Sequence, residues 1–274
     1  MKIYALCDDY AGYDSRFLAQ HGISILIDNG KNRVLFDTGQ KSDLILRNMR
    51  VLDIKPNSID LIFLSHCHYD HTGGLLGILN EIDKRIPVIA HPSIFRKNLY
   101  YKPVLRNVGI PYTRNELEKA GGEFILTKSF IKIAENIYST GEIERNPIYE
   151  GEKFTYTLVD GEIVQDNMLD DMSIVIKFDD GIGIITGCSH AGIVNIVEHS
   201  IKKMNVNRVK MIIGGLHLIN MDEKYVLNVA KKLKSMNVEK IYAGHCTGIY
   251  SHYIFREIFG ENYYVLYSGR IIEI

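Results

Sequence analysis

Short apolar runs separated by turn signals dominate the first part of the chain. Residues 23–27 and 33–36 are two such runs, and Asn29-Gly30 between them is a hairpin turn signal. Residues 59–64 form a continuous apolar run, which is typical of a strand buried on both faces. A helix is predicted over residues 42–50, because Ser42 can cap its start.

Strands and helices alternate along the rest of the chain. Further strands are predicted at residues 87–90, 124–126, 137–139, 154–159, 173–178, 182–186, 209–213 and 240–243, and two short strands close the chain. Helices are predicted from Thr72 onward, at about 191–204, at 223–236 and at 250–259. This alternation between strand-rich ends predicts a layered domain of the α/β (α+β) class. Residues 92–122 are less regular and are predicted to form an insertion in a single domain over residues 1–274.

Composition narrows the classes of function. The chain has 274 residues, of which 46% are hydrophobic, and a net charge of −1. The balanced charge counts against a nucleic-acid partner. No apolar run approaches the length of a membrane span, and the start lacks the apolar stretch of a secretory signal. We therefore expect a cytoplasmic protein without a membrane partner; the oligomeric state is left open.

The segment from Ser65 to His71 is the strongest chemical signal, because it holds four candidate metal ligands. His66 and His68 are two residues apart, so in an extended segment they project to the same side. Asp70 and His71 are adjacent and point differently, so they can serve a second ion. Imidazole and carboxylate ligands together suit zinc, manganese or iron. The alternative is a polar surface loop.

The pattern His-x-His-x-Asp-His after an apolar strand resembles the metallo-β-lactamase superfamily of metallohydrolases. This resemblance implies a four-layer αββα sandwich with the metals at one rim. Residues 36–39 resemble the first motif of the superfamily, whose Asp, here Asp37, holds the metal loop by hydrogen bonds. Gly244-His245 resembles the last motif, whose His binds the second metal.

The middle motifs depart from the pattern of the superfamily. Residues 140–142 and 186–188 stand where a Gly-His and a Gly-Asp are usual, so Glu142 takes the place of the His and Cys188 that of the bridging Asp. His190, two residues on, is the imidazole that can restore the count of ligands.

Three roles are open for Glu142 and two for Cys188. Glu142 can ligate, orient a histidine, or pair with Arg145, and it is left out of the ligand set. Cys188 can bind as a thiolate or can be a buried residue at a strand end. We predict two divalent metal ions, with zinc the first choice over manganese, iron and magnesium, held by His66, His68, Asp70, His71, Cys188, His190 and His245.

Further motifs resemble one subgroup of the superfamily. They lie at residues 20–24, 140–143, 187–192, 214–218 and 244–248. The subgroup includes the archaeal dihydropteroate-synthase-like enzyme of methanopterin synthesis. By this resemblance, such an enzyme joins a dihydropterin pyrophosphate to ribofuranosylaminobenzene 5′-phosphate and releases pyrophosphate. Most other members of the subgroup are known only as predicted metal-dependent hydrolases.

The sequence predicts a metal-dependent enzyme. The first hypothesis is a hydrolase that acts on a small phosphate- or ester-containing metabolite through a metal-bound hydroxide. The alternatives are the transferase that the subgroup implies and a non-catalytic metal-binding or sensor protein on the same fold. We assign proton handling to Asp70 and His217. His217 can instead contact the substrate or have a packing role. The expected partner is a small molecule, with phosphorylated ones among the candidates.

Other residues give weaker signals. Cys7 is expected to be a small buried residue and His91 a structural one. His21 is expected to be buried and hydrogen-bonded, with contact to a metal ligand as the alternative. His199 and His252 are expected to face solvent. The basic and aromatic stretch over residues 96–114 can recognise phosphate or a planar ring, with a solvated surface as the alternative. We predict a pocket beside the metals lined by residues 92–114.

Overall fold

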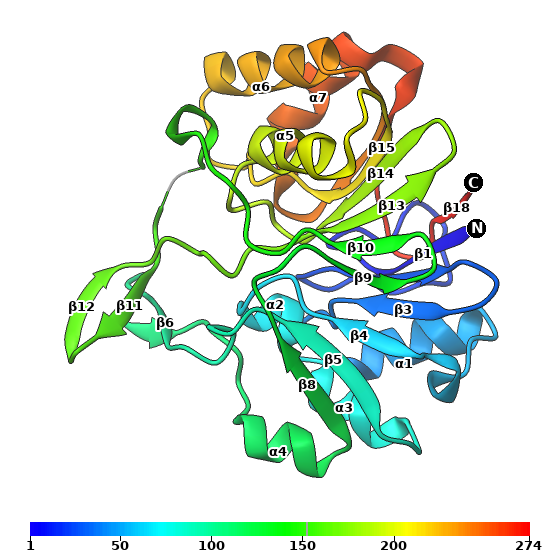
Figure 1. The fold of residues 1–274 in the computed structure, drawn as a ribbon, viewed down its shortest axis with the longest axis vertical. Helices are drawn as coiled ribbons and strands as arrows, with labels where there is room; N and C mark the ends of the chain where they lie inside the picture. The colour runs from blue at the N-terminus through cyan, green and yellow to red at the C-terminus, as the bar shows by residue number, and fades with distance from the viewer. Residues whose placement is uncertain (152) are drawn as a thin grey trace. The chain divides into compact units, whose positions relative to one another are not determined.

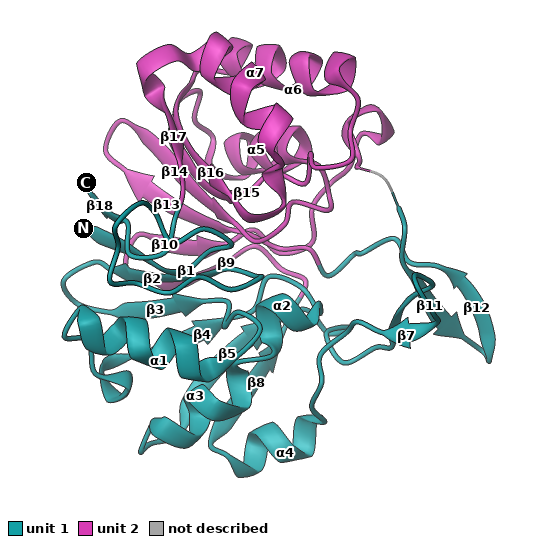
Figure 2. Ribbon diagram, turned by 180° about the vertical axis from the view of Figure 1, so that it is seen from behind, with its two compact units in different colours: residues 1–127, 153–170, 267–274 teal, residues 128–152, 171–266 magenta. Residues whose placement is uncertain are grey.

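The computed structural model describes residues 1–151 and 153–274, which form two compact units (Figure 2). Unit 1 consists of residues 1–127, 153–170 and 267–274. Unit 2 consists of residues 128–152 and 171–266. Each unit is built from segments that are distant in sequence. The prediction of a single domain over residues 1–274 stays a prediction.

Unit 1 contains a seven-stranded mixed sheet (Figure 1). Its strands, in spatial order, are β18 (Ile271–Glu273), β1 (Lys2–Cys7), β2 (Ser24–Asp28), β3 (Arg33–Phe36), β4 (Leu61–Phe63), β5 (Ile86–Ala90) and β8 (Gly122–Leu126). The pairs from β18 to β3 are antiparallel and those from β3 to β8 are parallel. The predicted hairpin at Asn29-Gly30 joins β2 to β3. All three residues of β4 are buried, as expected from their continuous apolar run.

Helices α1 (Ser42–Val51) and α3 (Leu75–Glu81) pack against the sheet of unit 1. Ile45 and Met49 of α1, together with Ile78 of α3, join a buried cluster with Leu35 of β3 and Ile62 of β4. Each such side chain contributes about 1.5–3 kcal/mol when it leaves water. Unit 1 also has η1 (Pro56–Ser58) and α4 (Arg114–Lys119), which starts with a capping box.

The helix predicted from Thr72 is divided into two. The short helix α2 (Tyr69–Thr72) carries Asp70 and His71, which were expected in a loop, and α3 follows after Gly73-Gly74. A Cβ atom on Gly73 would lie 2.3 Å from the carbonyl oxygen of Gln40. The two glycines therefore allow the chain before α1 to pass directly against α2.

A small four-stranded sheet also belongs to unit 1. It consists of β12 (Glu162–Gln165), β11 (Tyr156–Val159), β6 (Asn98–Tyr100) and β7 (Arg106–Asn107), and it lies apart from the larger sheet in both views (Figures 1 and 2). β6 and β7 lie in the segment predicted to be irregular. The strand predicted over residues 154–159 contains all of β11, whereas the sequence patterns missed β6, β7 and β12, which are short.

Unit 2 contains a second seven-stranded mixed sheet. Its strands, in order, are β17 (Tyr263–Val265), β16 (Val238–Gly244), β15 (Val209–Gly215), β14 (Gly181–Thr186), β13 (Ile174–Phe178), β10 (Ile137–Ser139) and β9 (Ile131–Ala134). The strands from β14 to β17 are parallel, and the pairs from β14 to β9 are antiparallel. All of them except β9 were predicted, to within a few residues at each end.

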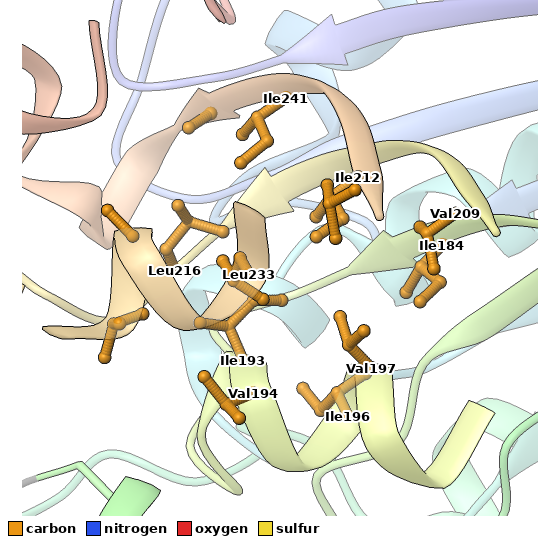
Figure 3. Packing of buried hydrophobic residues seen from close by; sticks show 14 of the residues in the cluster. Ile184, Ile193, Val194, Ile196, Val197, Val209, Ile212, Leu216, Leu233 and Ile241 are labelled. Atoms are coloured by element: carbon orange, nitrogen blue, oxygen red, sulfur yellow. The ribbon is translucent and has the colours of Figure 1, made fainter. Parts of the chain in front are cut away.

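The helices of unit 2 are α5 (Ile193–Met204), α6 (Glu223–Ser235) and α7 (Ile249–Phe259), with short turns η2 (Pro147–Tyr149), η3 (His245–Thr247) and η4 (Gly260–Asn262). Figure 3 shows how α5 meets the sheet: Ile193, Ile196 and Val197 lie in one cluster with Ile184 of β14 and Ile212 of β15. The spacing i, i+3, i+4 places these side chains of α5 on one face.

The longest helix in the described ranges, α6, has 13 residues, and none of these helices is long and apolar enough to cross a membrane.

Three histidines and Cys7 bear on the expectations from sequence. Cys7 is buried, and His91 is buried with its Nδ1 2.7 Å from the Ser93 hydroxyl, both as predicted. His252 is half-buried beside the Tyr263 hydroxyl, 2.6 Å away.

The expectation that His199 faces solvent is wrong, because only 3% of this residue is exposed. Its Nδ1 accepts a hydrogen bond from the Glu144 backbone N–H at 3.2 Å, and its Nε2–H donates to the Thr140 carbonyl at 3.1 Å. These partners require the neutral ring, and burial lowers the pKa of His199 below its usual value of 6.5.

We predict that His199 stabilises unit 2 near neutral pH and that this contribution is lost in acid. The folded state resists protonating the ring, so the contribution is complete above about pH 6.5 and falls as the pH drops through the folded-state pKa. His199→Gln should lower the free energy of unfolding at pH 7 by about 1 kcal/mol. The gap to the wild type should narrow at pH 5, as measured by urea denaturation. Lys231→Gln, on the exposed side of α6, is the control; a gap that is constant with pH would contradict the assignment.

Candidate metal centre

The loop of unit 1 that carries the candidate metal ligands, residues 66–71, is called the metal-ligand loop below. It is organised by the carboxylate of Asp37, which follows β3. Asp37 is fully buried, and its Oδ1 accepts a hydrogen bond from the Ser65 backbone N–H at 2.7 Å. Its Oδ2 accepts one from the Ser65 hydroxyl and one from His71 Nδ1, both also at 2.7 Å. The role that the resemblance implied for Asp37, holding the loop by hydrogen bonds, is therefore confirmed.

These bonds also determine which ring nitrogens can bind a metal. His71 donates from Nδ1 to Asp37, so its Nε2 is the nitrogen that can bind a metal ion once it loses its proton. The Ser65 hydroxyl donates its proton to the hydrogen bond with Asp37. Its oxygen can therefore only accept the hydrogen bond from His66 Nδ1, which lies 2.8 Å away. His66 is thus left with its lone pair on Nε2. One carboxylate orients both histidines, His71 directly and His66 through Ser65.

His68 is oriented by a different partner. Its Nε2 lies 3.1 Å from the side-chain oxygen of Asn98 on β6, and the amide nitrogen of Asn98 donates to Asp166 at 2.7 Å. The amide group is fixed by that second bond, so its oxygen faces the ring and His68 donates from Nε2. The lone pair of His68 is therefore on Nδ1.

The two oriented rings face each other across a short distance. His66 Nε2 lies 3.2 Å from His68 Nδ1, and in these tautomers both nitrogens carry lone pairs. Two acceptors at this distance repel each other unless a proton or a cation lies near both. Neutral imidazole nitrogens are the preferred ligands of zinc, so this pair fits a metal ion.

A second pair of candidate metal ligands, Asp70 and His71, lies on α2. Asp70 Oδ2 is 3.4 Å from His71 Nε2. Burial disfavours the charged ring of His71, but the carboxylates of Asp70 and Asp37 outweigh it and raise the pKa of His71 to about 9. The carboxylates thus attract positive charge to His71 Nε2, which a metal ion would supply in place of the proton.

His21 lies at the edge of this pair, and the expectation that it is buried is wrong. Its side chain is 52% exposed; Nδ1 is bonded to Asp9 at 2.9 Å and Nε2 lies 3.5 Å from Asp70 Oδ2. The hydrogen bond was predicted. The next residue must be glycine, since the chain passes so closely over α2 that a Cβ atom on Gly22 would lie 2.0 Å from the Asp70 carbonyl oxygen.

A buried ion-pair network supports the loop from its other side. The backbone N–H of Cys67 donates to Asp170 Oδ2 at 2.8 Å. The Arg96 guanidinium contacts the same oxygen at 2.7 Å and Asp166 Oδ2 at 2.7 Å. Arg96 thus ties the ligand loop to the segment that carries Asn98.

Unit 2 supplies a second set of donors at the ends of three neighbouring parallel strands. Cys188 and His190 follow β14, His217 follows β15 and His245 follows β16. The ligand atoms of Cys188, His190 and His217 all lie within 4.8 Å of one another. Cys188 Sγ is also 3.3 Å from His245 Nε2. A thiolate among imidazoles is a ligand set typical of zinc.

The backbone of these loops in unit 2 is strained. Ser189, His217 and His245 have φ values of 66°, 51° and 48°, in the left-handed region that residues with side chains rarely adopt. Cys246 braces two of the loops, because its thiol donates to the Cys188 carbonyl at 3.4 Å and accepts the His217 backbone N–H at 3.3 Å. Strain that is held in place in this way is common where side chains must be aimed at a site.

Glu142 forms an ion pair with Lys128 at 3.3 Å. Of the three roles open for Glu142, this contact supports pairing with a cation, here Lys128. The exclusion of Glu142 from the ligand set stays a prediction.

Sequence reasoning missed several residues that support the two donor sets: Ser65, Asn98, Arg96 with Asp166 and Asp170, and Cys246. Ser65 lies inside the histidine motif and Cys246 next to His245, so their position was a usable signal. Asn98 and Asp170 carry no such signal, since each contacts the loop across 30 and 103 residues of chain, respectively.

We predict that Asp37→Asn weakens metal binding without unfolding the chain. The side-chain amide of asparagine is neutral, so it cannot accept hydrogen bonds from the Ser65 hydroxyl and His71 as strongly as the carboxylate does. The orientation of His66 and His71 is therefore lost. Zinc affinity, measured by competition with a chromophoric chelator, should fall about 10- to 100-fold. Asp28→Asn is the matched control: Asp28 lies on β2, and the change removes a carboxylate that pairs with Arg33. Equal affinities for wild type and Asp37→Asn would refute this role.

The chain is similar to proteins of one superfamily along most of its length. The family model of the metallo-beta-lactamase superfamily matches residues 21–245. A 7,8-dihydropterin-6-methyl-4-(beta-D-ribofuranosyl)-aminobenzene-5'-phosphate synthase of Methanocaldococcus jannaschii is 43% identical, with 100% of this chain and 96% of that protein covered. An uncharacterized protein of the same organism is 37% identical, over 85% of this chain and 86% of the relative.

Solved structures confirm the predicted fold class. A metal-dependent hydrolase of the beta-lactamase superfamily superposes with a TM-score of 0.85 at 29% identity, over 100% of this chain and 99% of that one. A metallo-beta-lactamase fold protein from Bacillus subtilis superposes with a TM-score of 0.62 at 13% identity, over 99% of both chains. Because the synthase is an enzyme and the superfamily is mostly catalytic, the prediction of an enzyme is confirmed as well. The chain belongs to the metallo-beta-lactamase superfamily.

Proposed function

We propose that the chain is a metal-dependent transferase that joins a dihydropterin pyrophosphate to 4-(β-D-ribofuranosyl)aminobenzene 5′-phosphate. The observation that carries this proposal is the 43% identity to the M. jannaschii synthase along the whole of both chains. It favours the transferase, which the sequence analysis placed second, over the hydrolase that it placed first.

The proposed reaction forms one bond and breaks one. The arylamine nitrogen attacks the methylene carbon on position 6 of the dihydropterin, and a C–N bond forms. The C–O bond to the pyrophosphate breaks, and pyrophosphate leaves with the bonding electron pair. The nitrogen then loses one proton, so a base near the amine is required.

We infer that the donor sets of both units hold divalent metal ions. The set from unit 1 is His66, His68, Asp70 and His71, and the set from unit 2 is Cys188, His190 and His245. The orientation of the unit 1 imidazoles and the sulfur ligand that Cys188 offers in unit 2 support zinc as the first choice, with two ions in all. When bound, such ions would neutralise negative charge on the pyrophosphate leaving group.

His217 is the residue we assign to the proton. Its ring lies 4.2 Å, centroid to centroid, from that of His190, so it is beside the donor set of unit 2. An imidazole nitrogen that carries a lone pair can accept the amine proton. Asp70 is a weaker candidate, because His71 and His21 already face its carboxylate.

The proposed function predicts the metal content of the protein. The purified chain should contain about two divalent ions, and His68→Ala should lower the metal content and reduce condensation about 100-fold or more. Elemental analysis and a product assay with both substrates measure these effects. His252→Gln, which lies on α7, is the control. Wild-type protein without stoichiometric metal would refute the metal assignment, and hydrolysis of the pyrophosphate without any condensation would support the hydrolase instead.

The second prediction separates proton transfer from metal binding in unit 2. His217→Gln should lower kcat about 10²- to 10⁴-fold and leave the metal content unchanged. Cys188→Ser should lower the metal content as well as the rate. Loss of metal in His217→Gln would show that His217 is a ligand, and the assignment of the proton would then fail.

A further inference from the structure

A cleft of about 650 Å³ opens on unit 1 next to the metal-ligand loop. Three segments line it: residues 40–43 at the start of α1, Tyr69 and Gly73 around α2, and the segment from β7 to Tyr112. Tyr69 lies between His68 and Asp70 in sequence, so the cleft and the proposed metal ligands share one short helix and its entry. The volume is in the usual range of small-molecule sites.

The charged groups that line the cleft are Lys41, Arg106 and Asp43. Lys41 and Arg106 are exposed, and neither forms an ion pair with a carboxylate in the part of the chain that the structure describes. Two cations against one carboxylate leave a net positive cleft. A phosphate group, which Arg and Lys both bind well, suits this balance.

Two aromatic rings give the cleft a second property. The Tyr112 hydroxyl donates a hydrogen bond to the Gly73 carbonyl at 2.7 Å, which fixes its ring against α2. Tyr69 is half-buried, with part of its ring accessible. Tyrosine rings pack well against other flat rings, so the cleft can accept an aromatic group as well as a phosphate.

Of the other basic residues over 96–114, Arg96 and Arg114 form ion pairs elsewhere, and Lys97 and Lys102 do not line this cleft. Arg96 is held by Asp166 and Asp170. Arg114 pairs with Glu118 at 2.6 Å and lines a different cleft, in which Arg85 faces Glu123 at 3.7 Å. The structure therefore narrows the predicted phosphate-recognition stretch to Arg106 and adds Lys41, which sequence analysis did not single out.

We propose that this cleft binds the arylamine substrate, with its ribosyl 5′-phosphate at Lys41 and Arg106 and its benzene ring against Tyr69. The proposal rests on the proposed function for the identity of this substrate. It assigns the two phosphorylated ends to different places: the pyrophosphate belongs to the metal ions and the 5′-phosphate to the cleft. The ring at Tyr69 directs the amine toward the ligand loop.

Titration calorimetry of the full-length, metal-loaded protein tests the cleft directly. The probes are the arylamine 5′-phosphate, the same compound without its phosphate, and inorganic pyrophosphate. Lys41→Ala and Arg106→Ala should each weaken binding of the 5′-phosphate compound about tenfold, because one charge-assisted contact is lost. Binding of the other two probes should not change. In the condensation assay, both variants should raise KM for the arylamine and leave kcat nearly unchanged.

Arg85→Ala, from the other cleft, is the matched control and should change none of these values. Both substituted cations lie on the surface, and a thermal melt checks that the variants fold. Unchanged binding of the 5′-phosphate compound in both variants would overturn the proposal, and so would a loss confined to pyrophosphate, which would assign the cleft to the other substrate.

The two proposals fail separately. Condensation with an unchanged KM in Lys41→Ala and Arg106→Ala would refute the cleft and leave the transferase in place. Phosphate-dependent binding that requires Arg106, in a protein that never condenses the substrates, would refute the transferase and leave a phosphate site in the cleft.

Discussion

Three hydrogen bonds converge on the buried carboxylate of Asp37, and the orientation of the unit 1 ligands follows from them. The charge on Asp37 decides the direction of each bond: Ser65 and His71 must donate, and His66 must then donate to Ser65. Hydrogen bonds to a charged group contribute about 1.5–3 kcal/mol each, and removal of the acceptor would leave buried donors without one. A residue that touches no metal thus determines how two ligands present their lone pairs.

In each unit the candidate metal ligands follow the carboxyl ends of parallel strands. In unit 1 the ligand loop follows β4, and in unit 2 the candidate residues follow β14, β15 and β16, so all of them come after the carboxyl ends of parallel strands. Side chains at such ends are held by a rigid sheet and are free to converge. Unit 2 adds backbone strain at His217 and His245, and Gly215 lets Cys246 approach, since a Cβ atom there would lie 2.6 Å from the thiol.

Local patterns predicted the parts of the fold that are locally encoded. Continuous apolar runs marked β4 and β14 correctly, because burial of every residue is visible in the sequence. The density of ligand types at residues 66–71 marked the loop, and the resemblance marked Asp37. The patterns failed where the cause is distant: Asn98 and Asp170 act on the loop through tertiary contacts. His199 was misjudged because the backbone groups that hold it, at Thr140 and Glu144, lie more than 50 residues earlier.

Arg96 can be replaced by no other natural side chain without loss. Its Nε contacts Asp166 and its Nη1 contacts Asp170, two directions that a planar fork provides and a single ammonium group does not. A lysine would satisfy one carboxylate and leave the other as an uncompensated buried charge. Because Asp166 holds Asn98 and Asp170 holds Cys67, either choice would release one side of the histidine loop. Tolerance to exchange at this position is therefore set by the shape of a cation as well as by its sign.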